Sequence, residues 1–459
     1  MFSIMEKQKN MNSTGVHYDA VVIGLGQTGL SCVRYLSNQG LKVAVTDSRV
    51  TPPGLSILKN DYGSVPVYLG EINSELLLTA EQIILSPGVA LNEKAIKQAI
   101  REGISVYGDI ELFCQQVQAP IIAITGSNGK STVTTLVAGI LQQAGLKIQV
   151  GGNLGTPALD LLNEDVPDLY VLELSSFQLE TTFSLNAHAA VVLNISPDHM
   201  DRYSSLEDYA NAKKKIYAGN GLLVINKDDP IVNAMLDGER DHYYFSLSEP
   251  DENNFGIRTI DGDVWLCRGE ENIIKQDDLP VKGKHNVANA LAAMALASSV
   301  EVSEAAIVDA LKSYSGLAHR CQWVAKINDI DWYNDSKATN VGACISSIES
   351  LCQQGAIILI AGGDSKGTDL SSLGTVIQQH VKHVLLLGVD ANKIAAVIGG
   401  TTPVTFVNNM EEAVEQANRL AVAGNQVLLA PACASLDMYE NYQQRGDAFV
   451  SAVNALGVD

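Results

Sequence analysis

The sequence predicts an α/β protein in which strands and helices alternate through three successive blocks. Short apolar runs recur along the chain, and each ends in a glycine-rich or polar turn. Segments with the apolar spacing of helices separate most of these runs, and strands separated by helices form parallel, doubly wound sheets. A chain of 459 residues exceeds a single core. We therefore expect three domains, with bounds at 1–108, 109–316 and 317–459.

The first block is predicted to be a Rossmann-like domain. A strand over 20–23 enters the turn Gly24-Leu25-Gly26-Gln27-Thr28-Gly29, a helix follows over 30–39, and a strand over 42–46 ends at Asp47-Ser48-Arg49. Three spaced glycines followed by an acidic strand end are typical of dinucleotide binding. A carboxylate, a hydroxyl and a guanidinium can equally hold a uridine diphosphate, and a tight turn without a ligand is the plain alternative. The identity of the nucleotide stays open at this point.

The second block opens on a phosphate-binding loop. A strand over 121–124 enters Thr-Gly-Ser-Asn-Gly-Lys-Ser-Thr at 125–132, and a helix is expected over 133–143. Backbone N–H groups of such a turn surround phosphate oxygens, the lysine adds a charge, and the hydroxyl reaches a Mg²⁺. Ile124 stands where a full Walker A motif has its first glycine. We predict a nucleoside triphosphate site in a central P-loop ATPase-like domain with a mostly parallel sheet.

Two strand ends in this block carry further candidate residues. Glu173 ends an apolar strand over 169–174, where ligands bind in parallel sheets. It can complete a Mg²⁺ site with Ser131, or it can cap the following turn. The next strand, over 189–195, ends in a charged loop that contains His199. Further elements are expected as a strand over 221–225 and a helix over 286–299.

A lysine run at 213–215 falls on a predicted helix over 206–217. Helical spacing places Lys213 in the apolar stripe, whereas Lys214 and Lys215 face solvent. Burial penalises an ammonium ion and lowers its pKa, and a neutral amine near a metal site can be carbamylated by CO₂ to become an oxygen ligand. The alternative is a lysine stem that reaches out to water.

The third block is predicted to be a second Rossmann-like, doubly wound domain. Polar clusters follow its strand ends at 334–340, 362–366 and 431–437. Their side chains form a crevice for a small charged ligand, for which Lys337, Lys366 and Arg320 are the available cations. The expected strands cover 331–334, 356–361, 383–387 and 426–430.

Composition excludes several classes of function. The formal net charge of −21 argues against a nucleic-acid partner. Seven scattered cysteines without a CxxC pair make disulfides and structural zinc unexpected. The polar N-terminus is not a secretory signal, and we expect no membrane insertion because no apolar run is long enough to span a bilayer. A reducing, aqueous compartment is expected.

Six short segments in order along the chain resemble the Mur ligases: TGSNGKST at 125–132, LELSSFQ at 172–178, DHMDRY at 198–203, HN at 285–286, HR at 319–320 and NDSKATN at 334–340. The similarity covers essentially the chain past about Tyr18, and we expect the first 17 or so residues to be an extension. Within the family, the chain resembles the members that add D-glutamate to UDP-N-acetylmuramoyl-L-alanine. The resemblance implies an acid–amino-acid ligase of cytoplasmic peptidoglycan precursor synthesis, serving cell-wall biogenesis, cell shape and division.

The resemblance also implies a mechanism and a set of roles. ATP phosphorylates the substrate carboxylate, and the amine of D-glutamate attacks the acyl phosphate. Two Mg²⁺ ions are implied, held by Ser131, Glu173, His199 and carbamylated Lys213, and the catalytic residues are Lys130, Glu173, His199 and Lys213. ATP is expected at Gly126, Ser127, Asn128, Gly129, Lys130, Ser131, Thr132, Asn286, Arg320, Asp335 and Lys337. The uridine nucleotide substrate is expected at Asp47, Ser48, Arg49, Gly88 and Asn153. D-glutamate is expected at Thr339, Lys366, Ser435, Leu436 and Tyr442.

Departures from the family pattern are small, and three alternatives stand beside it. Ser48 replaces a frequent threonine, Ala318 a frequent proline, and Tyr442 a frequent phenylalanine. A sister ligase, including a folate-linked glutamate ligase, shares the ATP site. An NAD-dependent dehydrogenase fits the first glycine turn but leaves the phosphate loop unexplained. A P-loop switch binds nucleotide without chemistry. Small-molecule substrates and a monomer are expected.

Overall fold

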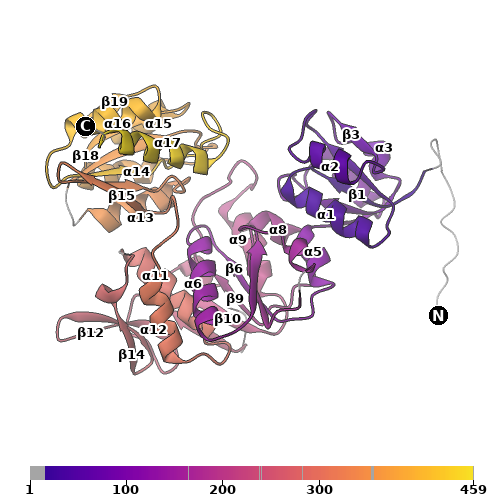
Figure 1. Cartoon of the computed structure of the whole chain (residues 1–459), viewed down its shortest axis with the longest axis horizontal. Coiled ribbons are helices and arrows are strands. Elements are labelled where there is room, and N and C mark those ends of the chain that lie inside the picture. The colour runs from indigo at the N-terminus through magenta and orange to yellow at the C-terminus, as the bar shows by residue number, and fades with distance from the viewer. Residues whose placement is uncertain are drawn as a thin grey trace. The chain divides into compact units, whose positions relative to one another are not determined.

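The computed structural model describes residues 16–163, 165–236, 238, 240–281, 283–352 and 356–457. These residues form three β-sheets with flanking helices (Figure 1), so the predicted α/β class with mostly parallel sheets is confirmed. The chain divides into two compact units. The first runs to Gln118 and includes Gly151–Val166 and Phe177–Leu185; the second comprises Ala119–Val150, Pro167–Ser176 and the chain from Asn186. The three domain bounds stay a prediction.

The sheet of the first unit is parallel, in the order β3-β2-β1-β4-β5. Helix α1 begins at Gln27, earlier than predicted, because the glycine turn continues directly into its first turn. A Cβ at Gly29 would lie 1.8 Å from the carbonyl oxygen of Gly24, so only glycine fits this contact. The elements are β1 (Tyr18–Ile23), α1 (Gln27–Asn38), β2 (Val43–Asp47), α2 (Leu55–Asp61), β3 (Val67–Leu69), α3 (Ser74–Leu77), β4 (Ala80–Leu85), α4 (Lys94–Arg101), β5 (Ser105–Tyr107) and α5 (Asp109–Cys114).

Two segments from the middle of the chain complete this first unit. Helix α7 (Ala158–Leu161) is bound through Asp160, which accepts a 2.6 Å hydrogen bond from Arg34 on α1. Glu111 on α5 accepts a 2.7 Å bond from the backbone N–H of Phe183. The exposed Asn153 therefore belongs to the same compact unit as the glycine turn of the first block.

The second sheet has the order β14-β13-β12-β11-β10-β9-β6-β8-β7. Helices α6 and α11 pack with the central strands into one apolar core. The end formed by β12, β13 and β14 is antiparallel and was not predicted, although Asp261-Gly262 is a hairpin signal. The elements are β6 (Ile121–Thr125), α6 (Lys130–Gln143), β7 (Ile148–Gly152), β8 (Leu169–Glu173), α8 (Ser176–Glu180), β9 (Ala189–Val192), α9 (Leu206–Lys214), β10 (Leu222–Asn226), α10 (Pro230–Asn233), β11 (His242–Phe245), β12 (Phe255–Ile260), β13 (Asp263–Arg268), β14 (Glu271–Lys275), α11 (Lys284–Ala297) and α12 (Glu304–Ser313).

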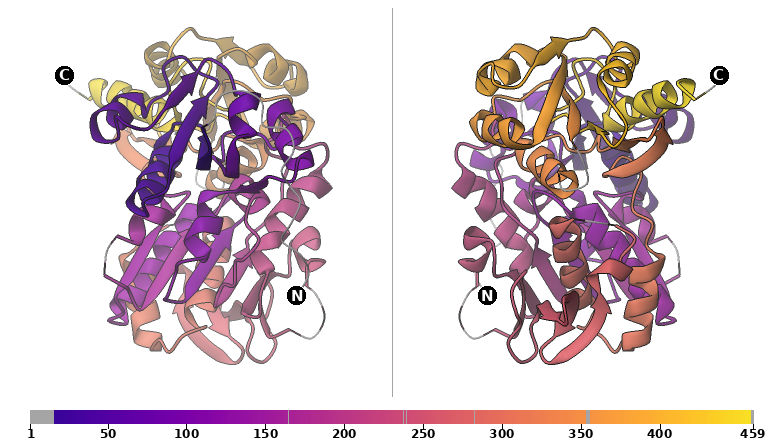
Figure 2. Two further views of the ribbon diagram at one scale, coloured as in Figure 1. Left: turned by 90° about the vertical axis from the view of Figure 1, so that its right-hand side faces the viewer. Right: turned by 90° about the vertical axis from the view of Figure 1, so that its left-hand side faces the viewer.

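The third sheet, in the order β15-β16-β20-β17-β18-β19, is parallel except for the β15–β16 hairpin. Helices α13, α14 and α15 cover one face and α16 and α17 the other (Figure 2). Strands β16, β20 and β17 are neighbours, so the three polar clusters lie at one edge. The elements are β15 (Gln322–Ile327), β16 (Ile330–Asn334), α13 (Val341–Leu351), β17 (Ile357–Gly362), α14 (Ser371–His380), β18 (Val381–Leu387), α15 (Ala391–Ile398), β19 (Val404–Phe406), α16 (Met410–Leu420), β20 (Gln426–Leu429) and α17 (Tyr442–Ala455).

In the part of the chain that the structure describes, we find no helix with the length and apolar character needed to cross a membrane.

Candidate nucleotide site and active site

The phosphate loop joins the buried strand β6 to helix α6. Gly126 and Gly129 have φ angles of +153° and +84°, which favour glycine. A Cβ at Gly129 would also lie 2.4 Å from Oδ1 of Asn289. Lys130, the first residue of α6, folds over the loop, and its Nζ donates hydrogen bonds of 2.8 Å to the Gly126 carbonyl and 2.9 Å to the Ser127 carbonyl. The loop therefore brings the Lys130 side chain and the N-terminus of the 14-residue helix α6 close together.

Asn194 supports the phosphate loop from the neighbouring strand end. Its Oδ1 accepts a 2.8 Å bond from the backbone N–H of Asn128, and its Nδ2 donates to the carbonyl of the same residue at 3.1 Å. The backbone N–H of Ser127 donates to the Asn194 carbonyl at 2.9 Å. Sequence reasoning missed Asn194, although an amide directly after the apolar run of β9 was an available signal.

Ser131 and Glu173 are in direct contact, as sequence reasoning required for a shared metal site. The Ser131 hydroxyl donates a 2.6 Å hydrogen bond to Glu173 Oε2. Arg320, which lies just before β15, donates from Nη2 to the Ser131 oxygen at 2.6 Å. A hydroxyl, a carboxylate and a guanidinium from three distant parts of the sequence therefore meet at the start of α6.

Lys213 is buried under the phosphate loop. The side chain is 1% exposed, whereas Lys214 and Lys215 are exposed, so the predicted helix face is confirmed. Its Nζ donates to the Gly126 carbonyl at 2.9 Å and lies 4.6 Å from the ring centre of Tyr209. Burial holds the pKa of Lys213 well below that of an ordinary lysine, and the charge of Lys130 adds to this effect. The lowered pKa makes the neutral amine that carbamylation requires easier to reach than for an exposed lysine.

His199 lies in the loop after β9 with a left-handed φ of +57°. Burial lowers the pKa of its imidazole against the opposing effect of Asp198, and the positive charges of Lys366, Lys130 and Lys213 lower it further. The neutral ring that binds metals is therefore favoured. Lys366 comes from the loop after β17, so this electrostatic interaction links that loop with the loop that contains His199.

The residue types at this point suit magnesium. Mg²⁺ prefers oxygen ligands, and Ser131 with Glu173 supplies a hydroxyl and a carboxylate side by side. Among the described residues, no group of three or more His, Cys, Asp or Glu side chains is arranged to hold a metal. Of the four predicted metal ligands, only Glu173 and His199 are of these residue types. Lys213 offers an oxygen only after it is carboxylated.

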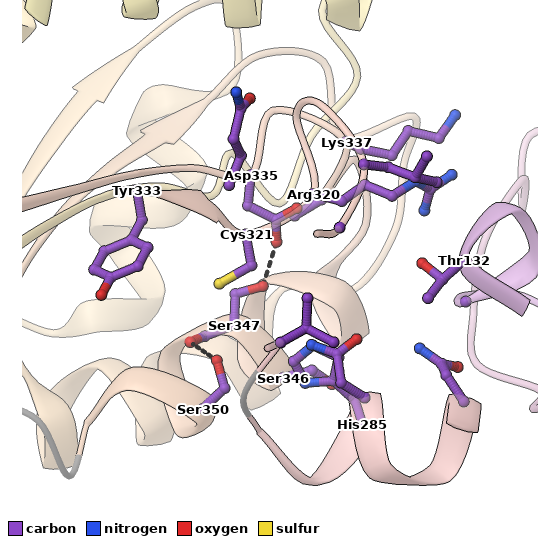
Figure 3. Close-up of a pocket in the computed structure, with 18 of the residues that line it drawn as sticks. Thr132, His285, Arg320, Cys321, Tyr333, Asp335, Lys337, Ser346, Ser347 and Ser350 are labelled. Atoms are coloured by element: carbon purple, nitrogen blue, oxygen red, sulfur yellow. Dashed lines mark hydrogen bonds between the residues drawn. The ribbon is translucent and has the colours of Figure 1, made fainter. Parts of the chain in front are cut away.

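A cavity of about 550 Å³ extends from the phosphate loop toward α13 (Figure 3). Arg320 and Lys337 point from one wall toward the side where Thr132 lies. On another wall, the Ser347 hydroxyl donates to Asp335, and burial raises the pKa of that carboxyl. The predicted ATP residues that line the cavity are Asn128, Gly129, Thr132, Asn286, Arg320, Asp335 and Lys337.

His285 also lines the cavity, and sequence reasoning had named it only as part of a motif. Burial lowers the pKa of its imidazole to about 4, so the ring is neutral at physiological pH. Arg320 and Lys337 bring positive charge to the cavity lining instead. Burial, with the charges of Arg320 and Lys130, lowers the pKa of Lys337 to about 8. Its Nζ lies 4.0 Å from the ring centre of Tyr442.

The predicted amino-acid residues are distributed over neighbouring loops of the third sheet. Thr339 follows β16, Lys366 follows β17 with a left-handed φ of +49°, and Ser435 follows β20 and is buried. Leu436 is 66% exposed, so its side chain makes little contact within the chain. Tyr442 begins α17. The loops after β17 and β20 are joined by two backbone hydrogen bonds, of 2.8 and 3.0 Å.

In the first unit, Asp47 and Arg49 form a two-point ion pair. Nε and Nη2 of Arg49 donate to the two carboxylate oxygens of Asp47 at 2.9 and 2.7 Å. The backbone N–H of Leu25, in the glycine turn, donates to Asp47 Oδ2 at 2.7 Å. Although burial opposes it, these hydrogen bonds hold the pKa of Asp47 below its ordinary value. Ser48 and Gly88 are exposed in the same unit, as expected of ligand-facing positions.

Comparison with known proteins places this architecture in a family. Three family models match in order: the Mur ligase MurD-like N-terminal domain at 18–108, the Mur ligase middle domain at 124–297 and the Mur ligase glutamate ligase domain at 319–433. A relative from Nitrosococcus oceani, named UDP-N-acetylmuramoylalanine--D-glutamate ligase, is 51% identical over 95% of this chain and 96% of its own. This chain belongs to the Mur ligase family. Relatives of the same name from Pseudomonas syringae pv. tomato and Pseudomonas aeruginosa are 48% and 47% identical to this Mur ligase, each over 95% of the chain and 98% of their own.

Solved structures share the fold of this Mur ligase at low identity. The UDP-N-acetylmuramate-alanine ligase MurC of Thermotoga maritima superposes with a TM-score of 0.61 at 18% identity, covering 96% of this chain and 100% of that one. A pseudomurein peptide ligase type C of Methanothermus fervidus gives a TM-score of 0.57 at 21% identity, covering 90% and 96%. At these identities the likeness supports the fold alone.

Proposed function

We propose that this Mur ligase joins D-glutamate to UDP-N-acetylmuramoyl-L-alanine and converts ATP to ADP and phosphate in the same reaction. The observation that carries this function is the identity of 47 to 51% to ligases of that name over 95% of the chain. The geometry agrees with the chemistry of the family, because a phosphate loop, a buried lysine and cationic loops of the third sheet converge in one unit. An NAD-dependent dehydrogenase would not need a phosphate loop, a buried lysine and cationic loops in the same unit.

The chemistry requires a phosphoryl group to move from ATP to a carboxylate and an amine to displace it. Lys130 and Arg320 bring positive charge to the start of α6, where charge builds up on the transferring group. The phosphate loop supplies backbone N–H groups for the same oxygens. After the acyl phosphate has formed, the amine of D-glutamate attacks its carbonyl carbon. The tetrahedral intermediate then releases phosphate and leaves an amide.

Magnesium is the expected cofactor, and the oxygen donors Ser131 and Glu173 are the residues to hold it. A bound Mg²⁺ neutralises charge on phosphate oxygens and orients them. We infer a second ion from the family resemblance, held by His199 and by Lys213 as its N-carboxylate. The burial of the Lys213 amine and its lowered pKa support this modification.

The remaining candidate residues divide among three ligands. We assign the ATP base, ribose and phosphates to the cavity residues Asn286, Arg320, Asp335 and Lys337 together with 126–132. We assign the uridine nucleotide to Asp47, Ser48, Arg49, Gly88 and Asn153 of the first unit. We assign D-glutamate to Thr339, Lys366, Ser435, Leu436 and Tyr442. Two carboxylates on this amino acid suit a site to which Lys366 and Lys337 bring positive charge.

The cellular setting follows from the same proposal. The substrates of such a ligase are small molecules, and UDP-linked precursors and ATP are consumed in the cytoplasm. We therefore propose cytoplasmic peptidoglycan precursor synthesis by a monomeric enzyme without a nucleic-acid partner. Gel filtration with light scattering tests the monomer directly, and a stable dimer would contradict it.

Coupled phosphate release tests the function. Purified protein with ATP, Mg²⁺ and UDP-N-acetylmuramoyl-L-alanine should release phosphate in the presence of D-glutamate, and far more slowly with L-glutamate or L-alanine. Lys130→Ala should abolish turnover because the transferring phosphoryl group loses its charge clamp. Phosphate release that ignores the acceptor and the amino acid would contradict the proposed reaction, and preferential use of another amino acid would indicate a sister ligase.

A further inference from the structure

Arg445 is a buried arginine that the reasoning above has not used. It lies on α17, three residues after Tyr442, and is 2% exposed. Its Nε donates to the Ser336 hydroxyl at 3.0 Å, and its Nη2 donates to the Ser336 carbonyl at 2.9 Å. Both terminal nitrogens lie 3.2 Å from the Cys433 carbonyl, and Nη1 reaches the Gly362 carbonyl at 3.5 Å. One guanidinium therefore binds three separate segments.

Each of these segments carries a candidate contact to the amino acid. Ser336 lies in the loop after β16, three residues before Thr339. Cys433 lies in the loop after β20, two residues before Ser435, and Gly362 ends β17, four residues before Lys366. The Ser336 hydroxyl also donates to the Tyr442 carbonyl at 2.8 Å. The arginine and its partner hydroxyl therefore fix the relative positions of all three loops and of the first residue of α17.

The nearby charge of Asp437 favours the charged form of Arg445. Among the described residues, its hydrogen bonds go to hydroxyl and carbonyl oxygens and not to a carboxylate. Burial lowers its pKa to about 10, so the side chain keeps its charge at neutral pH. A buried charge that is not hydrogen-bonded to a carboxylate is costly. A ligand that brings carboxylates to the loops above it offsets that cost.

We propose that Arg445 is the positioning residue of the amino-acid site, setting the spacing of the three loops and favouring a dicarboxylic amino acid through its charge. It acts through Thr339, Ser435 and Lys366 without touching the reacting atoms. This inference rests on the proposed function of the same site. It predicts that loss of the guanidinium weakens the use of D-glutamate and spares the use of ATP.

The test compares Arg445→Met, which has neither the guanidinium hydrogen-bond donors nor the charge, with Arg445→Lys, which keeps the charge. Gln443→Ala, an exposed position on the same helix, is the matched control. For Arg445→Met we expect the KM for D-glutamate to rise about 10- to 100-fold, as for lost hydrogen bonds to a charged group. The KM values for ATP and the UDP substrate should stay within about twofold. Arg445→Lys should lie in between, and Gln443→Ala should match the wild type.

A second readout separates the two proposals. Acyl phosphate formed without D-glutamate can be trapped with hydroxylamine, and Arg445→Met should retain this half-reaction. Failure of the wild type to form it would refute the proposed function. An unchanged KM for D-glutamate, an equal rise in every KM, or loss of the half-reaction in Arg445→Met would overturn the positioning role. If Arg445→Met does not fold, Ser336→Ala removes the Nε acceptor and should raise the KM for D-glutamate selectively; an unselective effect would overturn the inference.

Discussion

The pH dependence of nucleotide binding tests the electrostatics of the cavity. Burial and the charges of Arg320 and Lys130 lower the pKa of Lys337 to about 8, so the free protein loses this proton between pH 7 and 9. A bound phosphate favours the ammonium form and raises the pKa again. Binding therefore takes up a proton above pH 8, and affinity falls as the pH rises. With a pKa of about 8, the dissociation constant of the nucleotide should be about tenfold higher at pH 9 than at pH 7.

Calorimetric titration with ADP and Mg²⁺ in buffers of different ionisation enthalpy measures both the affinity and the proton uptake. Lys337→Arg is the matched variant because it keeps the charge and removes the titration in this range. Burial also lowers the pKa of Lys130, so this lysine is a second source of pH dependence that the variant retains. The difference between the two proteins isolates Lys337. Equal slopes and equal proton uptake in the wild type and Lys337→Arg would refute the reasoning.

Three further predictions concern other positions. Lys213→Ala should lose activity in the phosphate-release assay, whereas Lys214→Ala should keep it. Bicarbonate or a short carboxylate should partly restore the activity of Lys213→Ala. Equal losses in the two variants would contradict the helix-face argument. Gly129→Ala should lower kcat/KM for ATP at least about tenfold while the circular dichroism spectrum stays unchanged. The reason is that a Cβ at this position is strained at φ +84° and clashes with the side-chain amide of Asn289. Normal kinetics would show that the loop can adjust its conformation to accept the Cβ. Burial raises the pKa of Asp109 from its ordinary value of 3.8 to about 6, so the fold loses stability as the pH rises from about 4 to about 6 and does not regain it at higher pH. Asp109→Asn should therefore stabilise the fold by up to about 3 kcal/mol at pH 8 and by about half as much at pH 5. The thermal midpoint should rise more at pH 8 than at pH 5, and equal effects at both pH values would exclude this cause.

The fold was predictable where local signals were strong. Strands β6, β8 and β17 are apolar runs that end in glycine or polar residues, and the sequence located each of them within one or two residues. The antiparallel end of the second sheet and the short strands β3 and β19 were missed. Their residues are half-exposed and mixed in polarity, so pairing with a neighbouring strand, and not local composition, makes them strands.

The candidate site was partly predictable for a similar reason. The neighbourhood of Ser131 and Glu173 follows from parallel strands that end at one edge, and the burial of Lys213 follows from helical periodicity. Arg445 carries no comparable pattern, and the available signal for Asn194 is its place directly after the apolar run of β9. Each acts through partners in loops that are distant in sequence, and single positions of that kind have no periodic signature.

The sequence by itself determined the alternating α/β organisation, the phosphate loop and the membership of a ligase family, because these depend on local spacing and on motifs in a fixed order. Tertiary structure alone decided which side chains meet: Arg320 on Ser131, and Arg445 beneath three loops. These contacts span 189 and 109 residues of chain. Their geometry depends on how the sheets order their strands, and local sequence does not encode that order.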